Sequence, residues 1–597
     1  MKYSDVFVSW LVDMGYTHCF YVAGGNIMHV LESASHKLTC IPVVHEVTAG
    51  IAAEYFNEAQ LNSDQKAFAL VTAGPGLTNI ITAMAGAFLE SRDLLVVGGQ
   101  VKSSDLGNGS VRQSGIQEID GMSLTESLTV SQLQIRVPVA RCEVEATVQA
   151  GLTGRKGPVF IEFCIDAQGS EFVDELSNFG AEEKITVPLA TSLDAELFDL
   201  VLRAKRPVLL LGGGIHRSTA FSLQRQLADL SIPVMTTWNG ADRISSSAKS
   251  YFGRPNTWGQ RFSNVILQQA DLLIALGTRL GMQQTGFNWQ EFLPVGETIQ
   301  VDLDESELLK PNPTVKYPVH ADANDILPSI IEALNNSDKN TEWGNWLAFC
   351  ELVKKTLPLS EAANVKSQGA YINPYDFYLA LSEVSERGDS IIPSSSGAAE
   401  TVAMQALNQK AGTIIVTNKG LASMGYGLAG AIGASLAGAR RVIHLEGDGG
   451  FAQNIQDLGT VSAQCLNIKS FIFCNDGYAS IRMTQKSYFE GHYLGCDTKT
   501  GLGLPDWDHI GRAYSIPVVR LDPESSTEGQ LQQILSSDGP VLVLVPVNPE
   551  QTYLPKITSR IEPDGQIVSN PIHFMTPPLD SETAEKVFRY IPSTQDS

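Results

Sequence analysis

The feature that most constrains the fold is a repeated alternation of short apolar runs with helical patterns. Near the N-terminus, apolar runs at residues 67–72, 94–98 and 159–163 alternate with helical patterns such as 49–60 and 79–89. Strands that alternate with helices predict a parallel β-sheet covered by helices. The sequence therefore predicts an α/β fold.

The alternation restarts twice, which predicts three domains in one chain. A chain of 597 residues is also too long for one core, since domains average roughly 150 residues. Turn-rich or polar connections near 166–183 and 355–374 separate the three series. We expect three consecutive doubly wound parallel-sheet domains and a tail that wraps the surface or is partly mobile. The predicted bounds are 1–180 for the N-terminal domain, 186–350 for the middle domain, 365–547 for the C-terminal domain and 548–597 for the tail.

The composition excludes several classes of function. A net charge of −23 argues against binding nucleic acid, because that affinity depends largely on Lys and Arg. The N-terminus lacks a targeting pattern, and there is no apolar stretch of about 18 residues, so we expect a cytoplasmic protein without a membrane partner. The eight cysteines lack zinc-ligand spacing and are expected to be reduced.

The most specific motif is a glycine-rich turn between a strand and a helix. An apolar strand runs into GDGG at 447–450, and a helix is predicted from about Phe451. The next apolar run ends in NDG at 475–477. Because the carboxyl ends of neighbouring parallel strands meet at one edge of a sheet, we expect Asp448 and Asn475 to lie close together.

The residue types in these two turns suit a metal ion that is bridged to a phosphate. Mg²⁺ prefers oxygen ligands and often shares them with substrate phosphates. The predicted metal ligands are Asp448, Asn475 and the carbonyl of Gly477. Glycines would let the backbone approach a diphosphate, and a helix start would point N–H groups at it. A lone GDG would instead indicate an ordinary turn with a capping Asp.

The spacing from GDG to the following Asn resembles the signature of thiamin diphosphate (ThDP) enzymes. Further segments extend the resemblance over nearly the whole chain, to the acetolactate synthase branch of that family. They are HE at 45–46 between a strand and a helix, AGPG at 73–76 with TN at 78–79, IQE at 116–118, and GLASMG at 420–425. The resemblance implies a ThDP- and Mg²⁺-dependent enzyme.

The resemblance also implies roles for individual residues. Glu46 would hydrogen-bond the aminopyrimidine ring and activate the cofactor, and Gln117 would donate to a substrate oxyanion. The carbonyl of Ala422 would accept the exocyclic amine, and Met424 would support the bent cofactor. The alternatives are an ordinary helix-start Glu, a solvated loop Gln and a core Met. The predicted cofactor-binding residues are Pro75, Asn79, Gly397, Ala422, Met424, Gly447, Gly449, Gly450 and Ile481.

By the same resemblance, each active site combines two subunits. Glu46 would come from one subunit and the metal ligands from the other, which implies a homo-oligomer with its sites at the dimer interface. Relatives in this branch also carry FAD on the middle domain, and a vestigial empty site is the alternative. The residues at the matching positions are Gly213, Gly214, Gly277, Arg279, Asp302 and Asp322.

Two positions depart from the acetolactate synthase pattern. Gln283 stands where that branch has an Arg that reads the carboxylate of the acceptor, and Gln485 stands where many members have Trp. A neutral amide replaces the forked guanidinium poorly, so a second pyruvate should be recognised weakly. We expect Gln283 and Gln485 to lie in the acceptor pocket. Arg482 is predicted either to contact acceptor phosphates or to face solvent.

The stretch from YVAGGN at 21–26 to YASIR at 478–482 is more similar to acetolactate synthase-like proteins of surface-polysaccharide biosynthesis. The predicted function is decarboxylation of a small 2-oxo acid, such as pyruvate, and transfer of the acyl carbanion to an uncharged carbonyl compound such as a keto-sugar. The alternatives are an acetolactate synthase, an FAD- and ThDP-dependent oxidase, or a simple decarboxylase. A non-enzymatic binding protein would require the loss of Glu46, Asp448 or Asn475, and all three are present.

Overall fold

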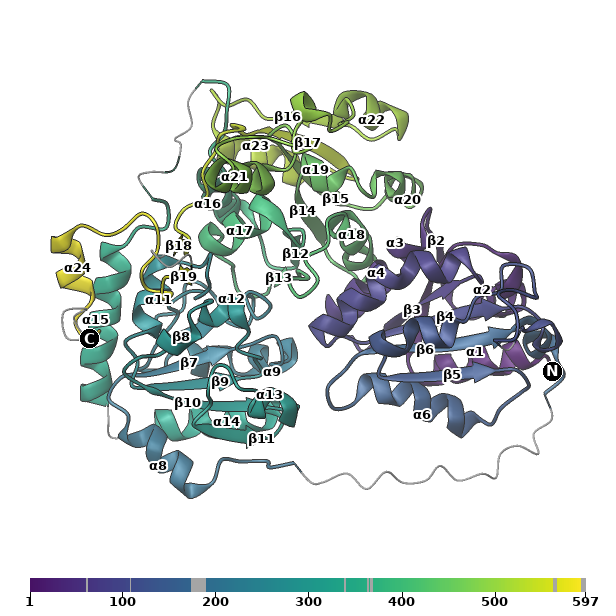
Figure 1. Cartoon of the computed structure of the whole chain (residues 1–597), viewed down its shortest axis with the longest axis horizontal. Helices are drawn as coiled ribbons and strands as arrows, with labels where there is room; N and C mark the ends of the chain where they lie inside the picture. The colour runs from purple at the N-terminus through teal and green to yellow at the C-terminus, as the bar shows by residue number, and fades with distance from the viewer. Residues whose placement is uncertain are drawn as a thin grey trace.

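Three parallel β-sheets, each flanked by helices, form the body of the molecule (Figure 1). The structure is a computed structural model, and it describes residues 1–60, 63–107, 109–172, 189–337, 340–361, 364, 369–561 and 566–591. The three sheets confirm the predicted fold class. Among the described residues, no helix has the length and apolar character that a membrane span needs.

The N-terminal sheet has the strand order β2-β1-β3-β4-β6-β5. Every residue of its central strands β4 and β6 is buried, which explains why they are continuous apolar runs in the sequence. The strands are β1 (Tyr16–Tyr21), β2 (Thr39–Pro42), β3 (Lys66–Val71), β4 (Leu94–Gln100), β5 (Ser131–Ile135) and β6 (Pro158–Cys164). The helices are α1 (Tyr3–Asp13), α2 (Met28–Ser35), α3 (Glu46–Glu58), α4 (Pro75–Glu90), α5 (Gly121–Thr125), α6 (Arg141–Leu152) and α7 (Ile165–Gly169).

The middle sheet has five strands in the order β11-β10-β9-β7-β8. They are β7 (Pro207–Leu211), β8 (Val234–Thr236), β9 (Leu272–Leu276), β10 (Glu297–Asp302) and β11 (Tyr317–His320). The helices are α8 (Ala195–Arg203), α9 (Arg217–Ser222), α10 (Gln224–Ala228), α11 (Arg261–Leu267), α12 (Met282–Thr285), α13 (Glu305–Leu309), α14 (Ala323–Asn335) and α15 (Asn340–Thr356).

The C-terminal sheet, β13-β12-β14-β15-β17-β16, repeats the topology of the N-terminal sheet strand for strand. Its strands are β12 (Asp389–Ile392), β13 (Ile414–Ile415), β14 (Arg441–Gly447), β15 (Ile468–Cys474), β16 (Val518–Arg520) and β17 (Val541–Pro546). The helices are α16 (Pro374–Val384), α17 (Gly397–Ala406), α18 (Tyr426–Leu436), α19 (Asp448–Phe451), α20 (Leu458–Ala463), α21 (Ala479–Tyr488), α22 (Trp507–Ala513) and α23 (Thr527–Ser536).

Helix α3 of the N-terminal domain packs directly on helix α18 of the C-terminal domain (Figure 1). Two glycines of α18 permit this approach. A Cβ atom on Gly430 would lie 2.5 Å from the ring of Tyr55, and one on Gly433 would lie 2.1 Å from the carbonyl oxygen of Ala52. One hydrophobic cluster therefore runs continuously through both domains, and it fixes the N-terminal end of α3 relative to the C-terminal sheet.

The C-terminal segment leaves its own sheet and wraps around the middle domain. It contains β18 (Ser559–Ile561), β19 (Ile567–Ser569) and α24 (Ser581–Val587). Ile572 and Val587 are fully buried in a cluster that otherwise belongs mainly to the middle domain. Arg261 of α11 donates to the carbonyl of Met575 at 3.1 Å. Of the two predicted alternatives, the described part of the tail follows the wrapping one.

Two further predictions can be compared with the structure. Helix α7 occupies the beginning of the predicted linker at 166–183, and residues 173–183 of that linker lie outside the described residues. The eight cysteines are all free in the structure.

Candidate active site

The two predicted metal-binding turns lie at the carboxyl ends of neighbouring strands. Strand β14 pairs in parallel with β15, so Asp448 and Asn475 meet at one edge of the sheet. The Asp448 carboxylate is 2% exposed and accepts hydrogen bonds from four backbone amides. These amides belong to Gly449, Asn475, Asp476 and Gly477. Burial, opposed by these four donors, raises the pKa of Asp448 to about 6.

The side chain of Asn475 completes a set of oxygen atoms that fits a hard cation. One terminal atom of its amide lies 3.2 Å from Oδ1 of Asp448 and 3.0 Å from the carbonyl oxygen of Gly477. With nitrogen in that place the amide donates to both oxygens. With oxygen in that place, the oxygen atoms of the Asn475 amide, the Asp448 carboxylate and the Gly477 carbonyl face one another, which suits a shared cation such as Mg²⁺. The residues therefore fit the predicted metal.

Arg482 supports the backbone of the predicted metal-binding turn, contrary to both predictions for it. Its side chain is 5% exposed and donates to the carbonyl oxygens of Asn475 at 3.0 Å and Asp476 at 3.1 Å. A third bond reaches the carbonyl of Pro549 at 3.1 Å. With these contacts Arg482 neither faces solvent nor is free for an acceptor.

The prediction of one helix that begins at about Phe451 is wrong, because the structure has two short helices separated by a 3₁₀ turn. Helix α19 ends at Phe451, the 3₁₀ turn η6 (Ile455–Asp457) follows, and α20 begins only at Leu458. Asn454 leaves the helical conformation, with φ −133°, and donates to the carbonyl of Gly425 at 2.7 Å. The interruption thus links the predicted metal-binding turn to loop 420–425, which carries the predicted cofactor contacts Ala422 and Met424.

Loop 420–425 contains strained backbone at a predicted cofactor contact. Ala422 has φ +55°, a left-handed conformation that is uncommon for residues other than glycine and that clusters at functional sites. Met424 is 37% exposed, and Nε2 of Gln453 lies 3.7 Å from its sulfur. The predicted Gly397, with φ +81°, begins α17 in the same domain, and Ile481 lies half-exposed on α21.

The N-terminal domain brings four predicted residues together. Glu46 is the first residue of α3 and is 8% exposed, and Nδ2 of Asn79 donates to its carboxylate at 2.9 Å. Pro75 begins α4 one residue after Gly74. A Cβ on Gly74 would lie 2.6 Å from the carbonyl oxygen of Gln117, so the Gln117 loop packs on this turn. His45 caps α3 by accepting from the N–H of Val47 at 3.3 Å.

Sequence reasoning missed Asp457, which joins the C-terminal domain to the N-terminal domain beside the predicted residue Glu46. Its carboxylate is fully buried and accepts from the backbone N–H of Val44 at 2.9 Å and from Oγ1 of Thr48 at 2.7 Å. Val44 and Thr48 flank Glu46. The signal that could have found Asp457 is an acidic residue in a segment whose neighbours Ile455 and Leu458 are apolar.

Asp457→Ala should destabilise the contact between the two domains. The substitution leaves the buried hydroxyl of Thr48 without its acceptor, and an unsatisfied buried group costs about 1–3 kcal/mol. Chemical denaturation measures the change in the free energy of unfolding. Asp506→Ala is the matched control, because Asp506 is an Asp that caps the exposed start of α22 within one domain. A loss no larger than that of the control would contradict a bridging role for Asp457.

Models of a known family match all three domains of the chain. The thiamine pyrophosphate enzyme N-terminal TPP binding domain matches residues 1–124, the central domain matches 195–330 and the C-terminal TPP binding domain matches 395–545. The chain belongs to the thiamine pyrophosphate enzyme family. The family's cofactor, thiamine pyrophosphate, is the ThDP that the sequence motifs predicted.

Relatives of this ThDP enzyme confirm the acetolactate synthase-like branch. The chain is 28% identical to the acetolactate synthase isozyme 1 large subunit of Escherichia coli K12, over 93% of this chain and 95% of that protein. It is also 28% identical to the acetolactate synthase large subunit of Cyanidium caldarium, over 89% of this chain and 92% of that protein. A probable acetolactate synthase large subunit of Methanocaldococcus jannaschii is 28% identical over 95% of this chain and 95% of that protein.

The predicted FAD residues of this ThDP enzyme lie at one edge of the middle sheet. Gly213 and Gly214 follow β7, Gly277 and Arg279 follow β9, and Asp302 ends β10, while Asp322 caps α14. These strands are neighbours. The edge is therefore the place where open α/β sheets bind ligands.

The glycine turn at this edge fits a pyrophosphate poorly. Four of the five amides from Gly212 to His216 already donate inside the chain, to Leu276, Gly277, Gly212 and Asn324. A dinucleotide's pyrophosphate needs free amides at such a turn. The buried Arg243 donates to the carbonyls of Gly213 and Ile215, and Asn324 donates to that of Gly214. This turn therefore leaves one free amide for a pyrophosphate, and FAD on the middle domain stays a prediction from the resemblance.

A cavity of about 210 Å³ lies between the middle and C-terminal domains. The predicted acceptor residue Gln283 and the predicted cofactor residue Gly397 both line it. The other lining residues are Thr257, Trp258, Phe287, Ala398, Thr401, Lys419, Ser480, Met483 and Tyr553. Sequence reasoning missed Trp258 and Lys419, since no motif marks them.

The structure does not bring Gln485 to this cavity. Its amide donates to the carbonyl of Leu494 at 3.1 Å and accepts from the N–H of Leu494 at 3.1 Å. The side chain thus braces an exposed loop beyond α21.

Proposed function

We propose that this ThDP enzyme decarboxylates a small 2-oxo acid, pyruvate in the first place, and transfers the acyl carbanion to an uncharged carbonyl compound. The neutral cavity supports the proposal most directly. Of its eleven lining residues only Lys419 carries a charge, and that ammonium lies 2.7 Å from the buried carboxylate of Glu400. A hydroxyl-rich acceptor such as a keto-sugar suits such walls, because neutral amides and hydroxyls both donate and accept hydrogen bonds.

The chain's own residues would perform the binding and proton-transfer work. When bound, ThDP supplies a nucleophilic carbon and an electron sink. In the proposal, Asp448, Asn475 and the carbonyl of Gly477 hold Mg²⁺ against the diphosphate. Glu46 holds a proton at the ring nitrogen of the aminopyrimidine, and Asn79 orients its carboxylate. The hydrogen bond of Asn79 to Glu46 supports this arrangement.

Other predicted residues would shape the site around the cofactor. The carbonyl of Ala422 accepts the exocyclic amine, Met424 supports the bend, and Gln117 donates to the substrate oxygen. The left-handed backbone at Ala422 and Gln117 supports special roles for both positions.

We also propose a homo-oligomer in which a second copy completes each site. Large apolar side chains near the proposed site are exposed in the single chain, with exposed fractions of 86% for Ile116, 49% for Ile481 and 37% for Met424. Exposed apolar surface of this kind favours a covering partner. Light scattering of the purified protein measures the mass. A cytoplasmic location stays a prediction from the sequence.

Gln283→Arg should redirect the enzyme from the uncharged acceptor to pyruvate. A hydrogen bond to a charged group contributes about 1.5–3 kcal/mol, so the ratio of acetolactate to transfer product should rise by about 10-fold to 100-fold. The assay gives the enzyme pyruvate and an excess of an uncharged aldehyde or ketone in one vessel and quantifies both products. Met282→Arg is the control, because Met282 is a half-exposed neighbour that does not line the cavity.

The second candidate is an acetolactate synthase that condenses two pyruvates, which the names of the relatives favour. It predicts acetolactate as the main product of the unmodified enzyme even when the uncharged acceptor is in excess. That outcome would replace the proposed acceptor while leaving the ThDP chemistry intact.

A further inference from the structure

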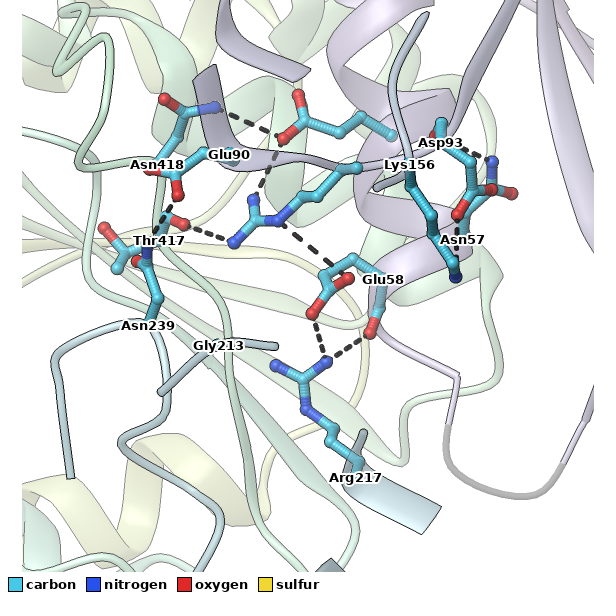
Figure 2. A network of polar contacts seen from close by, with 12 residues as sticks. Asn57, Glu58, Glu90, Asp93, Lys156, Gly213, Arg217, Asn239, Thr417 and Asn418 are labelled. Carbon is cyan, nitrogen blue, oxygen red and sulfur yellow. Dashed lines mark hydrogen bonds and ion pairs between the residues drawn. The ribbon is translucent and has the colours of Figure 1, made fainter. Parts of the chain in front are cut away.

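A buried ionic network joins the three domains where they meet, and its arginines are paired within the chain (Figure 2). Arg92 of the N-terminal domain donates to Glu54 at 2.9 Å and to the carbonyl of Thr417, in the C-terminal domain, at 2.7 Å. Arg217 of the middle domain donates to Glu58 at 2.6 Å. Breaking a buried ion pair is costly. This network therefore accounts for domain packing rather than for a further site.

Two cysteines outside this network lie side by side on neighbouring strands of the N-terminal sheet. Strand β1 pairs in parallel with β2, and the register places Cys19 directly opposite Cys40. Neighbouring strands are about 4.8 Å apart, and the Cα atoms that a disulfide joins are about 4.4–6.8 Å apart. The register therefore puts the two Cα atoms within the range that a disulfide spans.

The two thiols share one face of the sheet but differ in their access to solvent. Both side chains pack in the hydrophobic cluster that contains Phe7 of α1 and Val30 of α2. Cys19 is fully buried, whereas Cys40 is partly exposed. A small reagent can therefore reach Cys40, while the protein shields Cys19 from it.

The contact between the thiols makes Cys40 the better nucleophile of the two. A hydrogen bond from the Cys19 thiol lowers the pKa of Cys40, although burial opposes this effect. Burial raises the pKa of Cys19, and the hydrogen bond with Cys40 raises it further. The thiolate is the reactive form of cysteine. Cys40 should therefore react first, with Cys19 as a neutral thiol beside it.

The position of β2 in the sheet allows the two sulfur atoms to approach each other. Strand β2 is a four-residue edge strand, and β1 is its one neighbour in the described sheet. Cβ atoms in a disulfide are about 3.8 Å apart, so β2 must move toward β1 by about 1 Å. An edge strand can make this movement without leaving a second neighbour. A disulfide strained in this way is easily reduced again.

We propose that Cys19 and Cys40 form a redox-active dithiol, which a low-molecular-weight disulfide such as oxidised glutathione converts into a reversible disulfide. The Cys40 thiolate attacks one sulfur of oxidised glutathione and forms a mixed disulfide. The first glutathione leaves and takes up the proton that Cys40 has lost. The sulfur of Cys19 then attacks that of Cys40, and its proton leaves with the second glutathione. Two protein thiols are thus oxidised, and one glutathione disulfide is reduced to two thiols.

Peptide mapping of the native protein tests this proposal. The starting protein carries Cys465→Ser, which removes an exposed cysteine of the C-terminal domain. It is incubated with oxidised glutathione, its remaining thiols are blocked, and it is digested with trypsin without reduction. Cleavage after Lys37 puts Cys19 and Cys40 in separate peptides. The expected result is a cross-link between these two peptides, which is lost when an excess of reduced glutathione is added before blocking.

Variants that lack one thiol should stop the reaction at different stages. In Cys19→Ala, Cys40 should keep glutathione as a mixed disulfide, because the thiol that displaces it is absent. In Cys40→Ala, Cys19 should carry no glutathione, because it is fully buried. The fully buried Cys350 of α15 reports on the native fold and should stay unmodified in every sample. Should Cys19→Ala not fold, Cys19→Ser replaces it, since a hydroxyl is close to a thiol in size.

The outcomes distinguish a working pair from two independent thiols. A cross-link within one chain, together with a mixed disulfide on Cys40 in Cys19→Ala, supports the dithiol. Non-reducing electrophoresis shows whether the cross-linked protein has the mass of one chain or of two. Absence of the cross-link, or a cross-link between two chains, overturns the proposal. Glutathione that stays on Cys40 while Cys19 is present also overturns it, because Cys19 then does not complete the reaction.

Discussion

Asp448→Ala should abolish retention of ThDP. Asp448 supplies the one carboxylate among the three proposed metal ligands, and without the metal the diphosphate would face an acidic protein of net charge −23. Removing a residue that only orients a metal ligand lowers metal affinity by about 10-fold to 100-fold. Removing the ligand Asp448 itself should lower the affinity for ThDP, measured in the presence of Mg²⁺, by a larger factor. Isothermal calorimetry measures that affinity.

The carboxylate of Asp448 also binds four backbone amides, so stability must be measured beside affinity. Asp448→Asn is the milder variant, because it keeps one oxygen for these donors and removes the charge. Both variants should lose ThDP, whereas the alanine variant should unfold at the lower temperature. Unchanged ThDP affinity in a folded variant would refute the metal assignment.

Glu46→Gln should keep ThDP and Mg²⁺ bound but nearly stop activation of the cofactor. The amide preserves the shape beside Asn79 but cannot take up a proton at the ring nitrogen. Proton transfer by a positioned side chain contributes about 10²-fold to 10⁴-fold to a rate, so exchange at the C2 atom should slow by that factor. Nuclear magnetic resonance after rapid acid quench measures the exchange.

Glu143→Gln is the control for this variant, because Glu143 is also a Glu in the first turn of a helix, α6, and caps it. It should exchange at the unmodified rate. Exchange at that rate in Glu46→Gln would instead assign Glu46 the ordinary role of an acidic residue at a helix start.

Local sequence predicted the elements whose burial is nearly complete. Strand β15 is buried at all but its last residue and corresponds to the apolar run that the sequence shows directly before NDG at 475–477. Asp448 and Asn475 could also be placed together, because parallel strands fix where their carboxyl ends meet. In both cases the information lies within a few neighbouring residues.

The errors concern contacts between residues that are distant in sequence. Arg482 looks like a surface residue on α21, and its burial depends on the carbonyl of Pro549, 67 residues further along. Asn454 breaks a helix to reach Gly425, 29 residues earlier. Such contacts follow from how the elements pack, which periodicity does not encode.

The wrapping C-terminal segment affects the order in which the chain can fold as it leaves the ribosome. The hydrophobic cluster of the middle domain includes Val208 and Leu273, which are made early, and Ile572 and Val587, which are made last. Domains generally fold as units from the N-terminus during synthesis. Here the middle domain can complete its core only after the whole C-terminal domain has been translated, so its apolar face stays open longest and is the surface that a chaperone would cover.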